Sequence, residues 1–446
     1  MKSKSISILH SNVWKLAFCL LSYASTLQAA TVPPDRPLAI GELLAIALEN
    51  NPETSLMWWQ AQRASAAVGN ARSAFYPKFS LDANIAHGRD FRFTNGPDVN
   101  YTILTADVVM QFLVADFGER AANVEATLLA LGAAGWQTEW TLQKVMAQVF
   151  EKSYATLYAQ DTLEAYLLSL EDAKKMLDSA TKLNQAGLKP ISDVYSSKAS
   201  LAQIQIDVIQ HRSELRIQNA KLATTLGLDV DAVLQLAPID ALDVPQKSLL
   251  ALIHLSKEQR RDLMAQRAEV AVAMANKKKV DAKYRPKITL NSRGGAEKAL
   301  SDKRSKGAHY RVSLNLEVPI FTGFEDVYQK RMAYADIKIS EEELAQLELE
   351  IALEVLTQSN SVEATREMLK FAKENLDNAQ AAYDATLEKY NAGKERIAEV
   401  SIALRQIVHA RVRYSEIHAR YLTAIANLAF VTGSLNPSME GRCINQ

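Results

Sequence analysis

Four segments of the chain alternate apolar and polar residues, which is the period-2 pattern of a β-strand with one apolar face. They lie at 78–85, 101–112, 287–293 and 310–318, as two pairs that are each separated by a polar loop. Strands of roughly 9–11 residues suit a tilted bilayer crossing, with lipid on one face and water on the other. A half-buried hairpin of a soluble protein shows the same alternation, so the pattern alone leaves both interpretations open.

The polar positions of these segments mix charged residues with hydroxyls and amides, as expected for the water-filled inside of a barrel. Four strands cannot close a barrel in lipid, where every backbone group must be paired, so a barrel would have to be shared between chains. We expect Leu314 and Val108 to face lipid. We expect six polar residues to face the lumen: Asp82, Asp107, Asn291, Arg293, Arg311 and Asn315.

Two long stretches contain almost no helix-breaking residue. Between Gly118 and about Asn184 the only breakers are Gly132 and Gly135, and residues 324–392 contain none. Each stretch would extend about 100 Å as one continuous helix. In the second stretch, Leu, Ala and Tyr recur at spacings of three and four, which indicates a coiled-coil seam: Leu369, Ala372, Leu376, Ala379, Tyr383, Leu387 and Tyr390. The expected fold is mainly α with β, its helices packed side by side in a wall.

The chain is an internal duplication. Gly187, Ile191, Asp193 and Val194 recur, with Glu replacing Asp, as Gly393, Ile397, Glu399 and Val400. We therefore expect two repeats, at 31–249 and 250–446. Each would hold a strand pair, near 78–112 and 287–318, and a long helical hairpin, at 118–226 and 324–432. A single helix is expected before each strand pair.

The N-terminus has the layout of a secretory signal over residues 1–30. Lysines precede a short apolar run at 16–21, and Ala29 and Ala30 suit cleavage. Beyond residue 30 there is no uncharged apolar run long enough for a spanning helix. Signal removal takes Cys19 away and leaves Cys443, for which the sequence indicates no role.

Composition excludes several classes of function. The chain has 51 basic and 51 acidic residues, without the basic excess of a nucleic-acid-binding protein. Its 16 Gly and 12 Pro are about half the usual share, which favours long helices. The seven histidines form no HExxH pair, and there is no phosphate-binding loop; Gly294-Gly295 is expected in a polar loop. We expect no enzymatic activity, cofactor or metal.

Several motifs occur in a fixed order: Tyr76-Pro77-Lys78 and Arg285-Pro286-Lys287 at strand openings, Pro319 to Gly323 at a strand exit, and Tyr390 to Gly393 followed by Ile397 and Val400. With the signal and the duplication, they resemble the TolC-like outer-membrane efflux protein family over essentially the whole mature chain. The resemblance implies a homotrimer in the outer membrane of a Gram-negative bacterium, with one β-barrel shared by three chains and a periplasmic helical barrel. It also implies a passive conduit that works with a periplasmic adaptor and an inner-membrane RND or ABC transporter, in contact with outer-membrane lipid and without nucleic acid.

The resemblance also assigns roles near the two glycine turns. It places Gly187, Gly393 and Asp193 at the hairpin tips that meet the adaptor, and Glu399, Tyr390 and Glu395 at the periplasmic aperture. The next aperture acid of the family falls on Ile402, so the charged ring is reduced. The arginine usual at this tip is Glu395 here, which puts the family's tip hydrogen-bond pairing in doubt. By similarity, Asp193 is a peripheral or inter-helix residue.

One alternative remains open at this stage. An exported periplasmic coiled-coil adaptor or interaction protein would also combine a signal, long helices and small β-hairpins. An adaptor usually has one helical hairpin flanked by a Gly-rich lipoyl-like module, whereas this chain has two equal copies of one layout. The sequence does not indicate the cargo, which is a small molecule or metal in efflux and a protein in type I secretion.

Overall fold

The structure is a computed structural model that describes residues 36–90, 99–232, 234–237, 247–300 and 306–435. The expected signal segment 1–30 and Cys443 lie outside the described residues. One order of elements occurs twice. The first set is α2 (Ile40–Asn50), α3 (Pro52–Ser73), β1 (Lys78–Asp90), β2 (Val99–Ala115), α4 (Glu119–Gln185) and α5 (Ile191–Leu226). The second is α6 (Leu249–Gln259), α7 (Arg261–Lys283), β3 (Lys287–Ala299), β4 (Lys306–Glu317), α8 (Glu325–Asn391) and α9 (Ile397–Val431).

The helical segment before each strand pair is two helices, so the expectation of one was wrong. In the first repeat, α3 begins at Pro52, whose ring suits the first helical position, and the Asn51 side chain accepts a hydrogen bond from the backbone N–H of Glu53 at 2.7 Å. In the second repeat the break falls at buried Arg260, whose guanidinium binds Asp262 and Glu354. A side-chain cap at Asn51 therefore marks the first break, and a buried arginine paired with two carboxylates marks the second.

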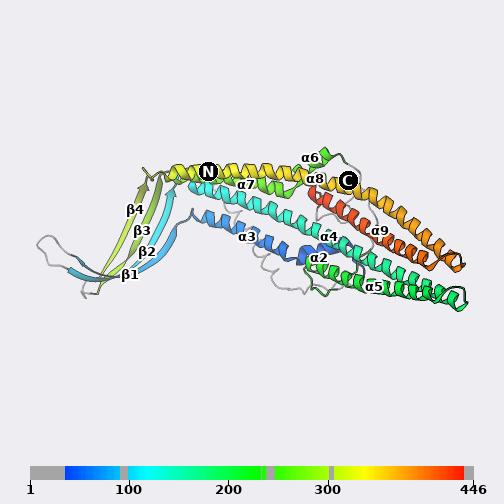
Figure 1. Cartoon of the computed structure of the whole chain (residues 1–446). Coiled ribbons are helices and arrows are strands. Elements are labelled where there is room, and N and C mark those ends of the chain that lie inside the picture. Colours follow the sequence, from blue (N-terminus) through cyan, green and yellow to red (C-terminus); the bar gives the residue numbers. More distant parts are fainter. Residues whose placement is uncertain (1–35, 91–98, 233, 238–246, 301–305, 436–446) are drawn as a thin grey trace, which may run out of the picture.

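The molecule is elongated, with the sheet at one end and the ends of two helical hairpins at the other (Figure 1). The two predicted long helices are confirmed: α4 and α8 each have 67 residues and extend about 100 Å. Ala372, Tyr383 and Tyr390 of the predicted seam are buried. No helix among the described residues is both long and apolar enough to cross a lipid bilayer.

The four strands form one antiparallel sheet in the order β1-β2-β3-β4. They are longer than the alternation predicted. Gly294 and Gly295 lie within β3, not in a loop as expected. Gly295 pairs with Asp107, and a Cβ at Gly295 would lie 2.1 Å from Oδ1 of Asp107. Gly295 therefore makes room for the Asp107 carboxylate on the neighbouring strand. Because glycine is neither apolar nor polar in pattern, its use here hides the alternation of apolar and polar residues in β3.

The register gives the sheet one polar and one apolar face, because direct partners in an antiparallel pair point to the same side. Asp82 pairs with Asp107, Asp107 with Gly295, and Gly295 with His309. The apolar face carries large exposed side chains within this chain; Leu314, for example, is 67% exposed. The same face holds further exposed residues: Phe79, Leu81, Ile85, Val108, Tyr310, Val312 and Leu316.

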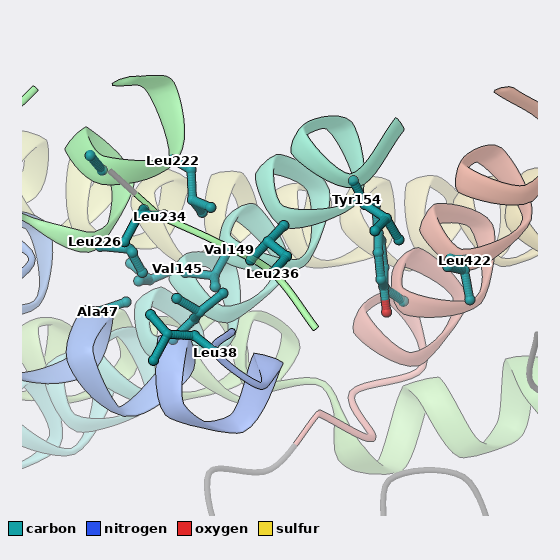
Figure 2. Packing of buried hydrophobic residues seen from close by; sticks show 14 residues of the cluster. Leu38, Ala47, Val145, Val149, Tyr154, Leu222, Leu226, Leu234, Leu236 and Leu422 are labelled. Atoms are coloured by element: carbon teal, nitrogen blue, oxygen red, sulfur yellow. The ribbon is translucent and has the colours of Figure 1, made fainter. Parts of the chain in front are cut away.

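The buried side chains form separate clusters along the helices. The cluster of Figure 2 joins α2, α4 and α5 with α9 in the middle of the molecule, and includes Val145, Val149, Leu226 and Leu422. A second cluster joins α4, α5, α8 and α9 toward the hairpin ends and includes Met176, Tyr383 and Tyr390. The helices are thus held as a layer along their length.

Candidate functional site

The two hairpins turn at glycines in the left-handed conformation. Gly187 has φ +71° between α4 and α5, and Gly393 has φ +76° between α8 and α9. Glycine ends a helix in this conformation without the steric strain that a Cβ atom would cause. Both turns lie at the end of the molecule away from the sheet (Figure 1).

Tyr390 joins the two hairpins within one chain. Its side chain is fully buried, and its hydroxyl donates a hydrogen bond to Oδ2 of Asp193 at 3.2 Å. Burial, together with the nearby Asp193 carboxylate, raises the pKa of Tyr390 above its usual range, so the phenol stays protonated as a donor. Asp193 is therefore an inter-helix residue, one of the two alternatives that the sequence left open.

Lys189 is a contact that sequence reasoning missed. Its Nζ donates to the backbone carbonyls of Gly393 at 3.4 Å and Glu395 at 2.8 Å, and lies 5.3 Å from the centre of the Tyr390 ring. The Glu395 carboxylate accepts from the backbone N–H of Arg396 at 3.1 Å. The positive charge at this junction thus comes from Lys189 of the first hairpin. The second hairpin has Glu395 at the position where the family usually has arginine.

Glu399 lies on the exposed side of α9. Val400, the next residue and about 100° further round the helix, is fully buried. Ile402 is also exposed and lies one turn further along the same side. An acidic and an apolar residue therefore follow one another on this surface, and the role of Glu399 at an aperture stays a prediction.

A second polar junction connects the hairpins further from the tip, and sequence reasoning missed it too. Nη1 of Arg411 donates to Oδ2 of Asp172 at 3.0 Å and to Oγ of Ser169 at 3.1 Å, and Nη2 donates to Oε1 of Gln380 at 2.8 Å. The Tyr383 hydroxyl donates to the carbonyl of Asp172 at 3.2 Å. Burial, then the Asp172 charge, raises the pKa of Tyr383. The junction ties α8 and α9 to α4.

The six residues expected to face a lumen share the polar face of the sheet. Arg293 lies between two of them, 3.7 Å from carboxylate oxygens of Asp82 and Asp107. Nε2 of His309 is 3.1 Å from Oδ1 of Asp107, which is buried in the chain. Lining of a lumen stays a prediction for all six: Asp82, Asp107, Asn291, Arg293, Arg311 and Asn315.

In the part of the chain that the structure describes, no group of three or more His, Cys, Asp or Glu side chains is placed to hold a metal ion. The arrangement is one of charge and hydrogen bonding: a two-faced sheet at one end and hairpin ends joined by buried polar contacts at the other.

Comparison with known proteins assigns the family. The outer membrane efflux protein family matches residues 43–228 and 252–434, one segment in each half of the chain. Protein CyaE of Bordetella pertussis is 26% identical over 91% of this chain and 86% of its own length. Outer membrane protein TolC of Vibrio cholerae is 22% identical over 89% of this chain and 91% of its own length.

The fold has solved counterparts. The CmeC outer membrane channel of Campylobacter jejuni superposes with a TM-score of 0.77 at 15% identity, over 90% of this chain and 87% of that chain. The fold class expected from the sequence, long helices with a small β domain, is confirmed.

The chain belongs to the outer membrane efflux protein family. It is an outer-membrane channel of the efflux and type I secretion class, with a periplasmic extension, from a Gram-negative bacterium. Proteins of this family act as trimeric channels with periplasmic adaptors and inner-membrane pumps. The channel interpretation of the sequence is confirmed, and the match over both halves disfavours a free-standing adaptor.

Proposed function

We propose that three copies of this outer membrane efflux protein assemble so that their sheets close into one shared barrel. The observation that carries this proposal is the sheet itself, which has an exposed apolar face, a charged opposite face and two edge strands, β1 and β4. Edge strands in lipid need partners for their backbone groups. Pairing β1 of one copy with β4 of the next satisfies these groups and places the polar face inside.

The helical part then forms the periplasmic conduit, and its far end forms the gate. Tyr390–Asp193 and the Lys189 contacts hold the second hairpin against the first, which is the closed arrangement. Glu399, exposed beside this junction, lines the aperture, where three like charges in a narrow mouth attract cations. Breaking the junction lets the second hairpin move outward and open the conduit.

The hairpin tips, with Gly187 and Gly393, contact a periplasmic adaptor, which couples the channel to an inner-membrane RND or ABC transporter. The channel is a passive conduit, because the transporter supplies the energy. The two repeats, 31–249 and 250–446, each supply half of the strands and one hairpin. This pairing of repeats accounts for the equal lengths of α4 and α8.

Disulfide cross-linking between edge strands tests the assembly. In a Cys443→Ser background, one cysteine on β1 and one on β4 should link neighbouring chains into covalent trimers in outer-membrane fractions. A matched pair on β2 and β3, which are partners within one chain, should give monomers only. A stable monomer in the soluble periplasmic fraction, without β1–β4 cross-links, would overturn the proposal.

A further inference from the structure

Two lysines stand side by side on the apolar face of the sheet. Lys298 of β3 is the direct cross-strand partner of Lys306 of β4, and Lys298 is also paired with Leu104 of β2. Both lysines are exposed. Like charges directly opposite each other destabilise a strand pair, so this arrangement calls for a compensating anion.

The pair marks one boundary of the apolar surface. On β4 the residues of this face from Leu316 to Ala308 are apolar or aromatic, a band about 26 Å long along the strand. Lys306 comes next on the same face. On β1 and β2 the next residues of this face beyond the row of Lys306 are polar. They are His87 and Thr102, whose Nδ1 and Oγ1 atoms are hydrogen-bonded at 2.8 Å. Because β4 begins at Lys306 and ends at Glu317, shortly before α8, the lysines lie at the end of the band away from the helices.

A hollow of about 550 Å³ accompanies the two lysines. Besides the two lysines, Glu297 and Gly307 line the hollow. The rest of its lining consists of small or apolar side chains: Leu104, Ala106, Ala296 and Ala308. Glu297 belongs to the opposite face and approaches Gly307. Neither lysine makes an ion pair with any carboxylate that the structure describes.

We propose that Lys298 and Lys306 bind the phosphate of an outer-membrane lipid, with an acyl chain against the small side chains of the hollow. This inference rests on the proposed function, because this face meets lipid only if the sheet spans the membrane. Two ammonium groups give a phosphate several charge-assisted hydrogen bonds and remove the repulsion within the pair. The apolar lining favours a phosphate attached to a lipid over free phosphate.

Native mass spectrometry of the purified trimer tests the proposal. The probes are bisphosphorylated lipid A, the same lipid with both phosphates removed, and inorganic phosphate. Each lysine at a membrane surface contributes about fivefold to anion binding, so Lys298→Gln/Lys306→Gln should weaken binding of the phosphorylated lipid about 25-fold. Arg311→Gln is the matched control, because Arg311 lies on β4 with its side chain on the opposite face.

The expected result is tight binding of the phosphorylated lipid alone, weakened about 25-fold in the double variant and retained in the control. Equal binding of the dephosphorylated lipid, unchanged binding by the double variant, or equally effective competition by inorganic phosphate would overturn the lipid site. If the trimers still assemble and conduct ions, any one of these outcomes would overturn the lipid site alone and leave the channel proposal unaffected. Failure of the parent to form membrane trimers would overturn both proposals.

Discussion

The hydroxyl of Tyr390 donates a hydrogen bond to Oδ2 of Asp193 over 3.2 Å and so connects the ends of two hairpins that are nearly 200 residues apart in sequence. The contact is a charge-assisted hydrogen bond at a buried ring. The Lys189 ammonium beside the same ring binds two carbonyls of the second tip. Three groups thus hold the tips together within one chain.

Tyr390→Phe should destabilise the closed tip. A hydrogen bond to a charged group contributes about 1.5–3 kcal/mol, so its loss should raise the open fraction about tenfold or more. Single-channel recordings in planar bilayers measure this change as more frequent openings or as a larger conductance. Tyr195→Phe is the control, because Tyr195 is an exposed tyrosine near the same tip. Equal recordings from both variants would contradict the role of the Tyr390 contact.

The fold was largely predictable because its signals are long and local. The absence of breakers from 324–392 gave α8 within one residue at each end, and the alternation around Leu314 and Asn315 gave both faces of the sheet. The helix breaks at Pro52 and Arg260 and the position of Gly295 were missed. The cap at Asn51 is a local signal that was overlooked. The buried ion pair of Arg260 with Glu354 and the close approach of Gly295 to Asp107 show only when distant residues meet.

The candidate site was predictable only where the two repeats or the family resemblance marked it. Glu399 and Tyr390 were singled out in this way, and their place at the aperture stays a prediction. Lys189 and Arg411 were missed, because each reads as an ordinary charged residue of a helical protein. Their partners are Glu395 and Asp172, more than 200 residues away, and no pattern within one helix indicates such pairs.

Arginine substitutions on adjacent residues of β4 should separate the two faces of the sheet. Leu314→Arg should lower the yield of trimer, because a charge facing lipid costs about 2–4 kcal/mol near mid-bilayer. Asn315→Arg should leave assembly nearly intact and alter ion selectivity. Gel mobility of unheated outer membranes measures the first effect and bilayer recordings measure the second. Equal tolerance at both positions would show that the faces are wrongly assigned.

Arg411→Met should lower the melting temperature of the trimer. Removing one partner of a buried ion pair costs up to about 3–5 kcal/mol. Arg411→Met removes the closer counter-charge of the Asp172 carboxylate and leaves it with exposed Lys175, whose Nζ lies 3.5 Å from Oδ1 of Asp172. Differential scanning fluorimetry in detergent measures the shift. Arg405→Met is the control, since Arg405 is exposed on the same helix. A double variant, Arg411→Met with Asp172→Leu, should recover much of the loss. No recovery would argue against the ion pair as the cause.

Asp161 should make stability depend on pH. Burial, with a smaller contribution from the Glu164 charge, raises the pKa of Asp161 from 3.8 to about 6 in the folded protein. The unfolded and folded pKa values bound a window from about pH 4 to about pH 6. Within this window the folded state binds more protons than the unfolded state, so the free energy of unfolding falls as the pH rises. Asp161→Asn should therefore raise the melting temperature at pH 7.5 and change it little at pH 4. Asp377→Asn, at an exposed position on α8, is the control. An unchanged pH profile in Asp161→Asn would refute the assignment.

Glu399→Gln should weaken the preference of the channel for cations. Glu399 is exposed on α9 beside the tip junction, and no contact with another described residue accounts for its charge. Three copies around an aperture would focus a negative potential in a narrow mouth, which concentrates cations and binds multivalent ones.

Reversal potentials and block by multivalent cations added from the periplasmic side measure this effect, with trimer yield unchanged. Glu395→Gln is the matched control, four residues earlier, because the half-buried Glu395 carboxylate accepts a backbone hydrogen bond. Since Asp193 is bound by Tyr390, Asp193→Asn should act on opening instead of on selectivity. Parent-like selectivity and block in Glu399→Gln, with a loss of cation preference in Glu395→Gln, would place the aperture charge at Glu395 instead of Glu399.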